Sequence, residues 1–266
     1  MQWSGVDVAM PGFRLPGIDM AGFRQRSPAF WDLGMVAHPS VTLLIDLSDG
    51  AGAAYETPAG RQHGSVMAGL LPGPVRATGW GRVECLQIRL APAVAAALYG
   101  GFADLSTTVA PLSEIWGRHL GRIEDGLRAA RSWDERFTIA AAALTPRRSV
   151  APEIARAWEL TVAGRGRVRV ADLAGEVGWS RQRLWSRFRA EVGVTPKVAA
   201  RLSRFDHAAH LLAAGRPAAV VATESGFADQ SHLHRETRRF AGMTPAAVAA
   251  SPWLAIDHRA WPRSSP

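Results

Sequence analysis

The chain has 266 residues, of which 47% are hydrophobic and 20% are charged. This balance supports a buried core, excludes wholesale disorder, and at about 100–200 residues per domain suggests two domains. No stretch approaches about 18 apolar residues without a charge, so we expect no membrane span, and the opening MQWSGVDVAM lacks the basic start of a signal peptide. The single cysteine excludes an internal disulfide and indicates a reducing cytoplasm.

The net charge of +8 is concentrated in the second half of the chain. Residues 1–150 hold 14 basic against 13 acidic residues, whereas residues 151–266 hold 17 against 10. A localised positive field favours a polyanionic partner, and nucleic acid is the first candidate. A basic surface that serves only solubility is the alternative that charge alone leaves open.

The front half predicts a β-rich body with many turns. Residues 1–30 show no clear period. The runs VTLLIDL at 41–47 and RVECLQIRL at 82–90 predict buried strands. Between them, eight glycines and prolines from 58 to 79 predict turns.

From residue 92 onwards the pattern changes to helices. A short helix is predicted by PAVAAALYG at 92–100, and a longer one by LSEIWGRHLGRIEDGLRAA at 112–130. Ser132 and Glu135 form a capping box that begins the next helix. The longer helix carries an apolar stripe that forms either a dimer seam or a contact with the β-rich body: Trp116, Leu120, Ile123 and Leu127.

Two segments of the basic half resemble each other. They are VADLAGEVGWSRQRLWSRFRAEVGVTP at 170–196 and AAVVATESGFADQSHLHRETRRFAGMTP at 218–245. Each predicts a short helix, a glycine, a tight turn, a longer helix and a Gly-x-Thr-Pro stop. This is the layout of a helix-turn-helix, because glycine accepts the positive φ that lets two helices cross sharply.

The second helix of each unit leaves a polar face free. Leu184 and Phe188 are expected to hold the first such helix on its partner, and the free face then suits DNA, because Gln pairs with adenine edges and Arg with guanine edges or phosphates. The predicted DNA-binding residues of the first unit are Ser180, Arg181, Gln182, Arg183, Trp185, Ser186, Arg187 and Arg189. Those of the second unit are Asp229, Gln230, Ser231, His232, His234, Arg235, Arg238 and Arg239. Ser180 and Asp229 are the expected N-caps.

A long helix is predicted between the two units, over KVAARLSRFDHAAHLLAAG at 197–215. At about 1.5 Å per residue it spans roughly 28 Å. Such a rod can place two recognition helices in successive major grooves, about 34 Å apart, on one side of DNA. The alternative is a pair of ordinary helical hairpins whose polar faces are solvated.

These features resemble the DNA-binding domain of AraC/XylS-type transcription regulators. GFADQSHLHRETRRFAGMTP at 226–245 is the most specific match, and ADLAGEVGWSRQRLWSRFRAEVGVTP at 171–196 supports it. The resemblance implies a regulator that activates or represses promoters in the cytoplasm, with double-stranded DNA and RNA polymerase as partners. Thr237 departs from the family, which usually has a large apolar residue there, so the second unit is expected to be looser. Trp185 is unusual on a groove-facing position.

For the front half, the resemblance implies a domain that senses a small effector. The predicted fold class is α+β: a β-rich, cupin-like regulatory domain with trailing helices over 1–146, then an all-α domain of two helix-turn-helix units joined by a long helix over 152–252. A tail follows over 253–266, and residues 145–152 are the predicted hinge. In relatives the trailing helices dimerise, which implies a homodimer through residues 112–144.

Two alternatives come from other classes: an enzyme with a cupin-like catalytic front domain, and a non-specific nucleoid protein. An enzyme would need clustered metal ligands or a nucleophile with a base. His38 and His63 are isolated, and Cys85 is expected to be a small buried hydrophobe within a strand. We therefore predict no catalytic residues, no metal and no cofactor, and favour the sequence-specific regulator.

Overall fold

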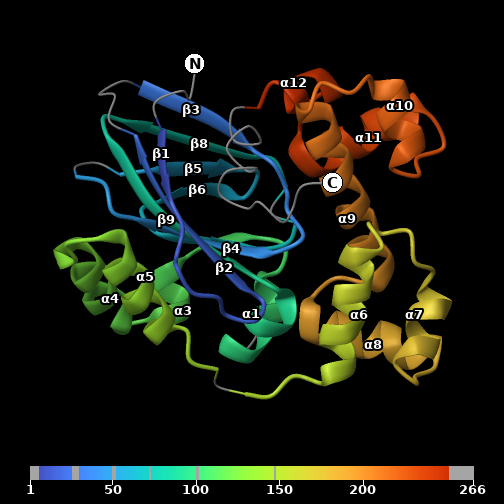
Figure 1. The fold of residues 1–266 in the computed structure, drawn as a ribbon, viewed down its shortest axis with the longest axis horizontal. Helices are drawn as coiled ribbons and strands as arrows, with labels where there is room; N and C mark the ends of the chain where they lie inside the picture. Colours follow the sequence, from blue (N-terminus) through green and yellow to red (C-terminus); the bar gives the residue numbers. More distant parts are fainter. Residues whose placement is uncertain are drawn as a thin grey trace.

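The protein consists of a β-rich front domain beside a helical back domain, as a computed structural model shows (Figure 1). The α+β class predicted from the sequence is confirmed. The predicted tail lies outside the described residues. These residues are 6–25, 30–49, 52–71, 73–99, 102–146 and 148–251. Within them, every helix falls short of the length and apolar character that crossing a lipid bilayer requires.

Two antiparallel sheets face each other in the described part of the front domain. The larger sheet has the order β1-β2-β9-β4-β7-β10, and the smaller one has the order β3-β8-β5-β6. The strands of the larger sheet are β1 (Val6–Ala9), β2 (Ile18–Gln25), β4 (Val41–Asp46), β7 (Val66–Ala68), β9 (Val83–Leu90) and β10 (Val109–Pro111). Those of the smaller sheet are β3 (Phe30–Met35), β5 (Ala54–Thr57), β6 (Gly60–His63) and β8 (Val75–Trp80).

The larger sheet is buried on both faces at its central strand β4. All six residues of β4 are buried: Leu43 and Ile45 join the main core cluster, and Leu44 joins a second cluster with residues of the smaller sheet. The predicted strands at 41–47 and 82–90 are confirmed as β4 and β9. Strands β1, β2 and the start of β3 lie in residues 1–30, where the sequence shows no period.

Five helices follow or interrupt the described strands of the front domain: α1 (Pro92–Leu98), α2 (Phe102–Leu105), α3 (Leu112–Trp116), α4 (His119–Ala129) and α5 (Trp133–Ala143). The single helix predicted over 112–130 is wrong. Gly117 takes a φ of 53°, which ends α3 and separates it from α4. The predicted capping box is confirmed, because the Glu135 amide donates to Ser132 Oγ over 3.2 Å.

The apolar stripe of α3 and α4 faces the front domain itself. Trp116 and Leu127 are buried in the main core cluster, and Leu120 and Ile123 are partly buried against it. Of the two predicted roles, packing on the β-rich body therefore accounts for most of this stripe.

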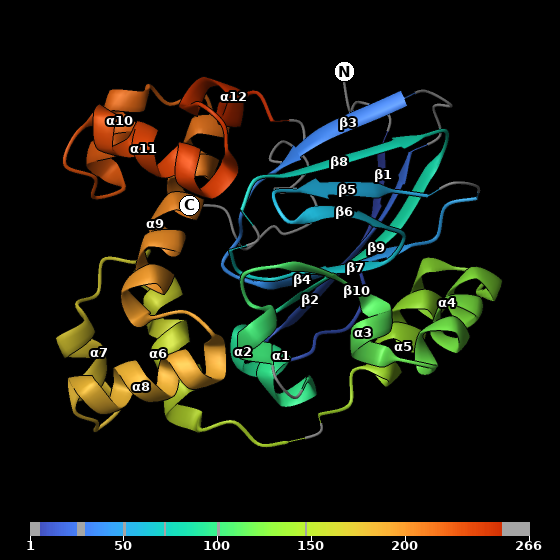
Figure 2. The ribbon, with the colours of Figure 1, turned by 180° about the vertical axis from the view of Figure 1, so that it is seen from behind.

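The back domain contains two helix-turn-helix units at opposite ends of one long helix (Figures 1 and 2). The first unit is α7 (Val170–Glu176) and α8 (Arg181–Val192), and the second is α10 (Ala218–Glu224) and α11 (Gln230–Ala241). The long helix α9 (Pro196–Ala213) joins them, while α6 (Pro152–Ala163) and α12 (Pro245–Ala249) flank them. The predicted glycine turns are confirmed, with φ values of 67° at Gly178 and 74° at Gly226.

The two domains are in contact at several points. The predicted hinge is held on α1, because the Arg148 amide donates to the Ala97 carbonyl over 3.1 Å. The Arg148 guanidinium also pairs with Glu191 of α8 over 2.7 Å. The linker helix approaches the front domain where Asp206 lies 3.7 Å from His38.

Candidate nucleic-acid interface

Both predicted recognition helices begin at a side-chain cap. Ser180 Oγ accepts a hydrogen bond from the Arg183 amide over 3.2 Å, and Asp229 Oδ1 accepts one from the His232 amide over 2.6 Å. These caps satisfy backbone donors that the first turn of a helix leaves unpaired. Both N-cap predictions are confirmed. Ser180 and Asp229 are thus occupied by the protein's own backbone.

The inner face of α8 holds the helix on the rest of the domain. Leu184 and Phe188 are fully buried, and the Phe188 ring stacks on Trp158 of α6 with centroids 6.1 Å apart. The apolar contact predicted for these residues is therefore confirmed. Because the buried side is fixed, the opposite side of α8 is available to a partner.

The outer face of α8 is exposed and cationic. Two guanidinium groups lie over tryptophan rings, Arg183 over Trp179 at 4.6 Å and Arg189 over Trp185 at 5.5 Å. Trp185 is 45% exposed. The predicted residues that are exposed on this helix are Arg181, Gln182, Arg183, Trp185, Ser186, Arg187 and Arg189. Arg187 also forms an ion pair within the protein, because its guanidinium lies 3.4 Å from the Glu191 carboxylate.

The outer face of α11 has a similar character. The predicted residues that are exposed there are Gln230, Ser231, Arg235, Arg238 and Arg239. His234 is half-buried. His232 is also half-buried, and its ring meets Phe227 edge-on with centroids 5.3 Å apart, which gives it a structural part in the turn.

Two contacts hold the second unit on the linker helix. Arg201 of α9 donates to both carboxylate oxygens of Glu236, over 2.9 and 2.5 Å, and Phe205 stacks on Phe240 at 5.1 Å. This hydrogen bonding raises the pKa of Arg201. Thr237 is fully buried, and its hydroxyl donates to the His234 carbonyl over 2.9 Å. The departure at Thr237 therefore leaves no unpaired polar group.

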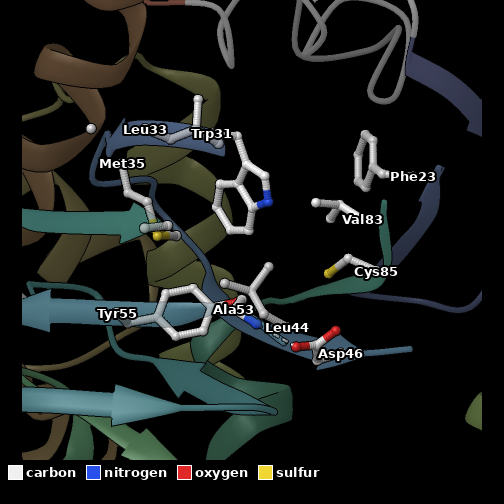
Figure 3. A pocket seen from close by; sticks show the side chains of 12 residues that line it. Phe23, Trp31, Leu33, Met35, Leu44, Asp46, Ala53, Tyr55, Val83 and Cys85 are labelled. Carbon is white, nitrogen blue, oxygen red and sulfur yellow. Dashed lines mark hydrogen bonds between the residues drawn. The ribbon is translucent and has the colours of Figure 1, made fainter. Parts of the chain in front are cut away.

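A cavity lies between the two sheets of the front domain (Figure 3). This cavity was not predicted from the sequence. Its volume is about 70 Å³. Its lining comes from strands far apart in the sequence, so no local pattern marks it. The lining residues are Phe23, Trp31, Leu33, Gly34, Met35, Leu44, Asp46, Ala53, Tyr55, Ala77, Val83 and Cys85.

Cys85 lies within β9, as predicted, and faces this cavity. Burial raises the pKa of its thiol, and the nearby Asp46 carboxylate raises it further. The thiol is therefore protonated at neutral pH, which makes it a poor nucleophile, as predicted. The predicted burial is met only in part, because Cys85 is half-buried.

The two predicted isolated histidines differ in their surroundings. His63 is exposed at the end of β6. His38 lies 2.7 Å from Ser40 Oγ and 3.1 Å from the Arg89 guanidinium within the front domain. It also lies 3.7 Å from Asp206 of α9, so it belongs to the contact between the domains. Burial, then the charges of Arg89 and His210, holds its pKa well below the usual value. Across the described ranges, no group of three or more His, Cys, Asp or Glu residues is placed to hold a metal ion.

Comparison with known families and structures points to one class of protein. A family model described as a helix-turn-helix domain matches residues 173–251. No curated protein matches the sequence. Residues 173–251 contain α8, α9, α10 and α11, so the match covers both candidate recognition helices and the rod between them.

Among solved structures, ToxT from Vibrio cholerae in its P21 form has a TM-score of 0.50 and 11% identity, over 90% of this chain and 98% of that one. ToxT with an unsaturated fatty acid bound has a TM-score of 0.46 and 13% identity, over 88% and 95%. A regulator from Chromobacterium violaceum with an AraC-type DNA-binding domain has 24% identity over 38% of this chain and 92% of that one, with a TM-score of 0.36. The chain thus shares the ToxT fold, and its residues 173–251 match a helix-turn-helix domain.

Proposed function

We propose that the protein binds promoter DNA sequence-specifically through the outer faces of α8 and α11, and that this binding regulates transcription. The observation that carries the proposal is the repetition of one surface. Two capped helices with exposed glutamine and arginine side chains stand at opposite ends of α9, which has 18 residues. At about 1.5 Å per residue that helix is roughly 27 Å long, close to the spacing of successive major grooves.

The side chains divide into two roles. Residues near the middle of each outer face reach base edges, and we assign Gln182, Trp185 and Ser186 of α8 and His234 and Arg235 of α11 to this role. The remaining predicted residues, chiefly Arg181, Arg183, Arg189, Gln230, Ser231, Arg238 and Arg239, contact phosphates and set the register on the duplex. Affinity then depends strongly on salt, because each phosphate contact releases counterions.

The front domain is proposed to sense a small effector in the cavity between its sheets. The cavity lies between the two sheets, and the smaller sheet also contacts the back domain where Gly34 of β3 faces Met243, so its occupant can bias how the back domain is held. We place the effector in this cavity because the cavity lining is mostly apolar with few polar groups, as the linings of ligand sites usually are.

The remaining partners are proposals of the same kind. We propose that the protein acts on the nucleoid in the cytoplasm, and that RNA polymerase at the bound promoter is its partner in activation or repression. A homodimer through residues 112–144 would use surface of α3, α4 and α5 that lies outside the buried stripe. We propose that the protein acts by binding DNA and an effector, and not by catalysis.

The experiment that tests the function is genome-wide capture of DNA fragments bound by the full chain, followed by affinity measurements on the recovered sites. We expect a shared sequence upstream of genes, bound about 10³-fold or more tightly than random DNA at ~0.15 M salt. Equal affinity for recovered and random DNA would instead identify a non-specific nucleoid protein.

A further inference from the structure

We propose that the cavity between the sheets takes a small, uncharged, mostly apolar molecule with one hydrogen-bond acceptor, to which Trp31 donates. The inference rests on the proposed function and deepens it by naming the chemical class of the effector. Three observations carry it: an unpaired indole N–H, a fixed indole ring, and a lining without a cation.

The first observation is the unpaired donor. Trp31 is 4% exposed, and its Nε1 has no hydrogen-bond partner in the part of the chain that the structure describes. In Figure 3 the nitrogen edge of the ring is turned away from β3 toward the space beside Val83. Buried indole N–H groups normally find an acceptor, because leaving one unpaired is costly. An acceptor inside the cavity would supply it.

The second observation is that the ring cannot easily turn elsewhere. Trp31 pairs with Gly79 across β3 and β8, and the indole lies directly over that glycine. A methyl group at Gly79 would lie 2.3 Å from Cζ2 and 2.8 Å from Nε1. The indole ring therefore packs directly on the backbone of Gly79. This packing fixes the direction of the N–H group.

The third observation is the charge of the lining. Asp46 is acidic, and its two oxygens already accept hydrogen bonds from the Ser48 amide over 2.9 Å and the Ala53 amide over 2.6 Å. None of the lining residues that the structure describes is Arg, Lys or His. Burial raises the pKa of Tyr55 and of Cys85, so both stay neutral. A carboxylate ligand would meet a like charge without a counterion, which disfavours it.

Size narrows the class further. One water-sized group needs about 10–15 Å³ of such space, and the cavity offers about 70 Å³. Aromatic and thioether side chains line it, including Phe23, Tyr55 and Met35. A single ring with a short carbonyl or ether substituent fits this space and these contacts.

The test uses three probes of nearly equal shape: acetophenone, α-methylstyrene and benzoate. Acetophenone has a carbonyl acceptor, α-methylstyrene replaces that oxygen with a methylene group, and benzoate adds a negative charge. Their affinities for the full chain are measured by titration calorimetry without DNA. We expect acetophenone to bind about 3- to 10-fold more tightly than α-methylstyrene, as one neutral hydrogen bond gives, and benzoate to bind more weakly than both.

Two matched variants locate the donor. Trp31→Phe removes the N–H group and keeps an aromatic ring, so the preference for acetophenone over α-methylstyrene should disappear. Trp80→Phe makes the same change at a tryptophan on β8 that is 73% exposed, and it should leave the preference intact. If Trp31→Phe does not fold, the preference in the wild-type chain decides the question alone.

Four results would overturn the inference. They are equal affinity of the wild type for acetophenone and α-methylstyrene, benzoate binding as tightly as acetophenone, a preference that survives Trp31→Phe, and no binding of any probe. Promoter binding is measured separately on the same protein. If the protein proves not to bind promoter DNA, the probe affinities still test the ligand class. If the probe prediction fails, the measured promoter affinity still tests the proposed function.

Discussion

Gly34, on the cavity-lining strand β3, faces the side chain of Met243, in the turn after the second recognition helix. A methyl group placed on Gly34 would lie 3.0 Å from Met243 Sδ. One strand thus contributes to the cavity wall and touches the helix-turn-helix domain. We propose that this contact couples an effector in the cavity to the orientation of α11.

A bulky side chain at Gly34 should destabilise this contact. We expect Gly34→Leu to lower stability by about 1–3 kcal/mol through overpacking. The second change Met243→Ala should restore part of that loss, because it removes the obstructing side chain. Denaturant unfolding of the two single variants and the double variant measures the coupling. Simple additivity of the two effects would show that the residues do not touch.

The ion pair between the linker helix and the second unit should be important for stability. Glu236 is 4% exposed and binds Arg201 through both oxygens. Glu236→Ala leaves a partly buried guanidinium without its partner, at a cost of about 2 kcal/mol after allowance for solvent. Adding Arg201→Ala should cost little more. Thermal unfolding measures both variants, and an unchanged midpoint for Glu236→Ala would contradict the assignment.

The protein should lose stability in mild acid. Burial, followed by the charges of Arg89 and His210, holds the pKa of His38 well below 6.5. Burial is also the largest cause that lowers the pKa of His207, to about 4. Below about pH 6.5 the unfolded chain binds protons at these positions while the folded chain does not, so stability falls as the pH falls. Unfolding between pH 7 and 5 should show this decline. His38→Gln should flatten it, and an equally steep profile in that variant would exclude His38 as a source.

Arg235 should discriminate among bases. We expect Arg235→Ala to lower affinity for the cognate site by about 1–3 kcal/mol and to relax one base position. Arg156→Ala is the matched control, because Arg156 is an exposed arginine of the same domain that pairs with Glu176 and Glu159 on α7 and α6. Affinities for a set of single-base operator variants measure the effect. A uniform loss over all variants would reassign Arg235 to phosphate.

The back domain could be predicted from the sequence because its signals are local. Leu184 and Phe188 are four residues apart, and Ser180 and Asp229 cap helices that begin one residue later. Each signal depends on neighbours within one or two turns. Once these helices were predicted, their exposed faces could be predicted as well. Arg187 and His232 on these helices also make contacts within the protein.

The front domain could be predicted only in part because its pairings are distant. Strand β2 is fixed by β9, with Ile18 opposite Leu90, and no pattern in residues 1–30 anticipates that partner. The cavity depends on Trp31 lying over Gly79, a relationship that exists only once β3 and β8 pair. The wrong prediction of one helix over 112–130 has a different cause, because the glycine at 117 is a local signal for a break that the helical pattern outweighed.

Hydroxyl-radical footprinting of the full chain on its recovered operator tests the central claim most directly. Two recognition helices on one rod should protect two patches on one side of the duplex, with centres about 10–10.5 base pairs apart. Arg235→Ala should weaken one patch and leave the other. A single protected patch, or protection on opposite sides of the duplex, would contradict the account.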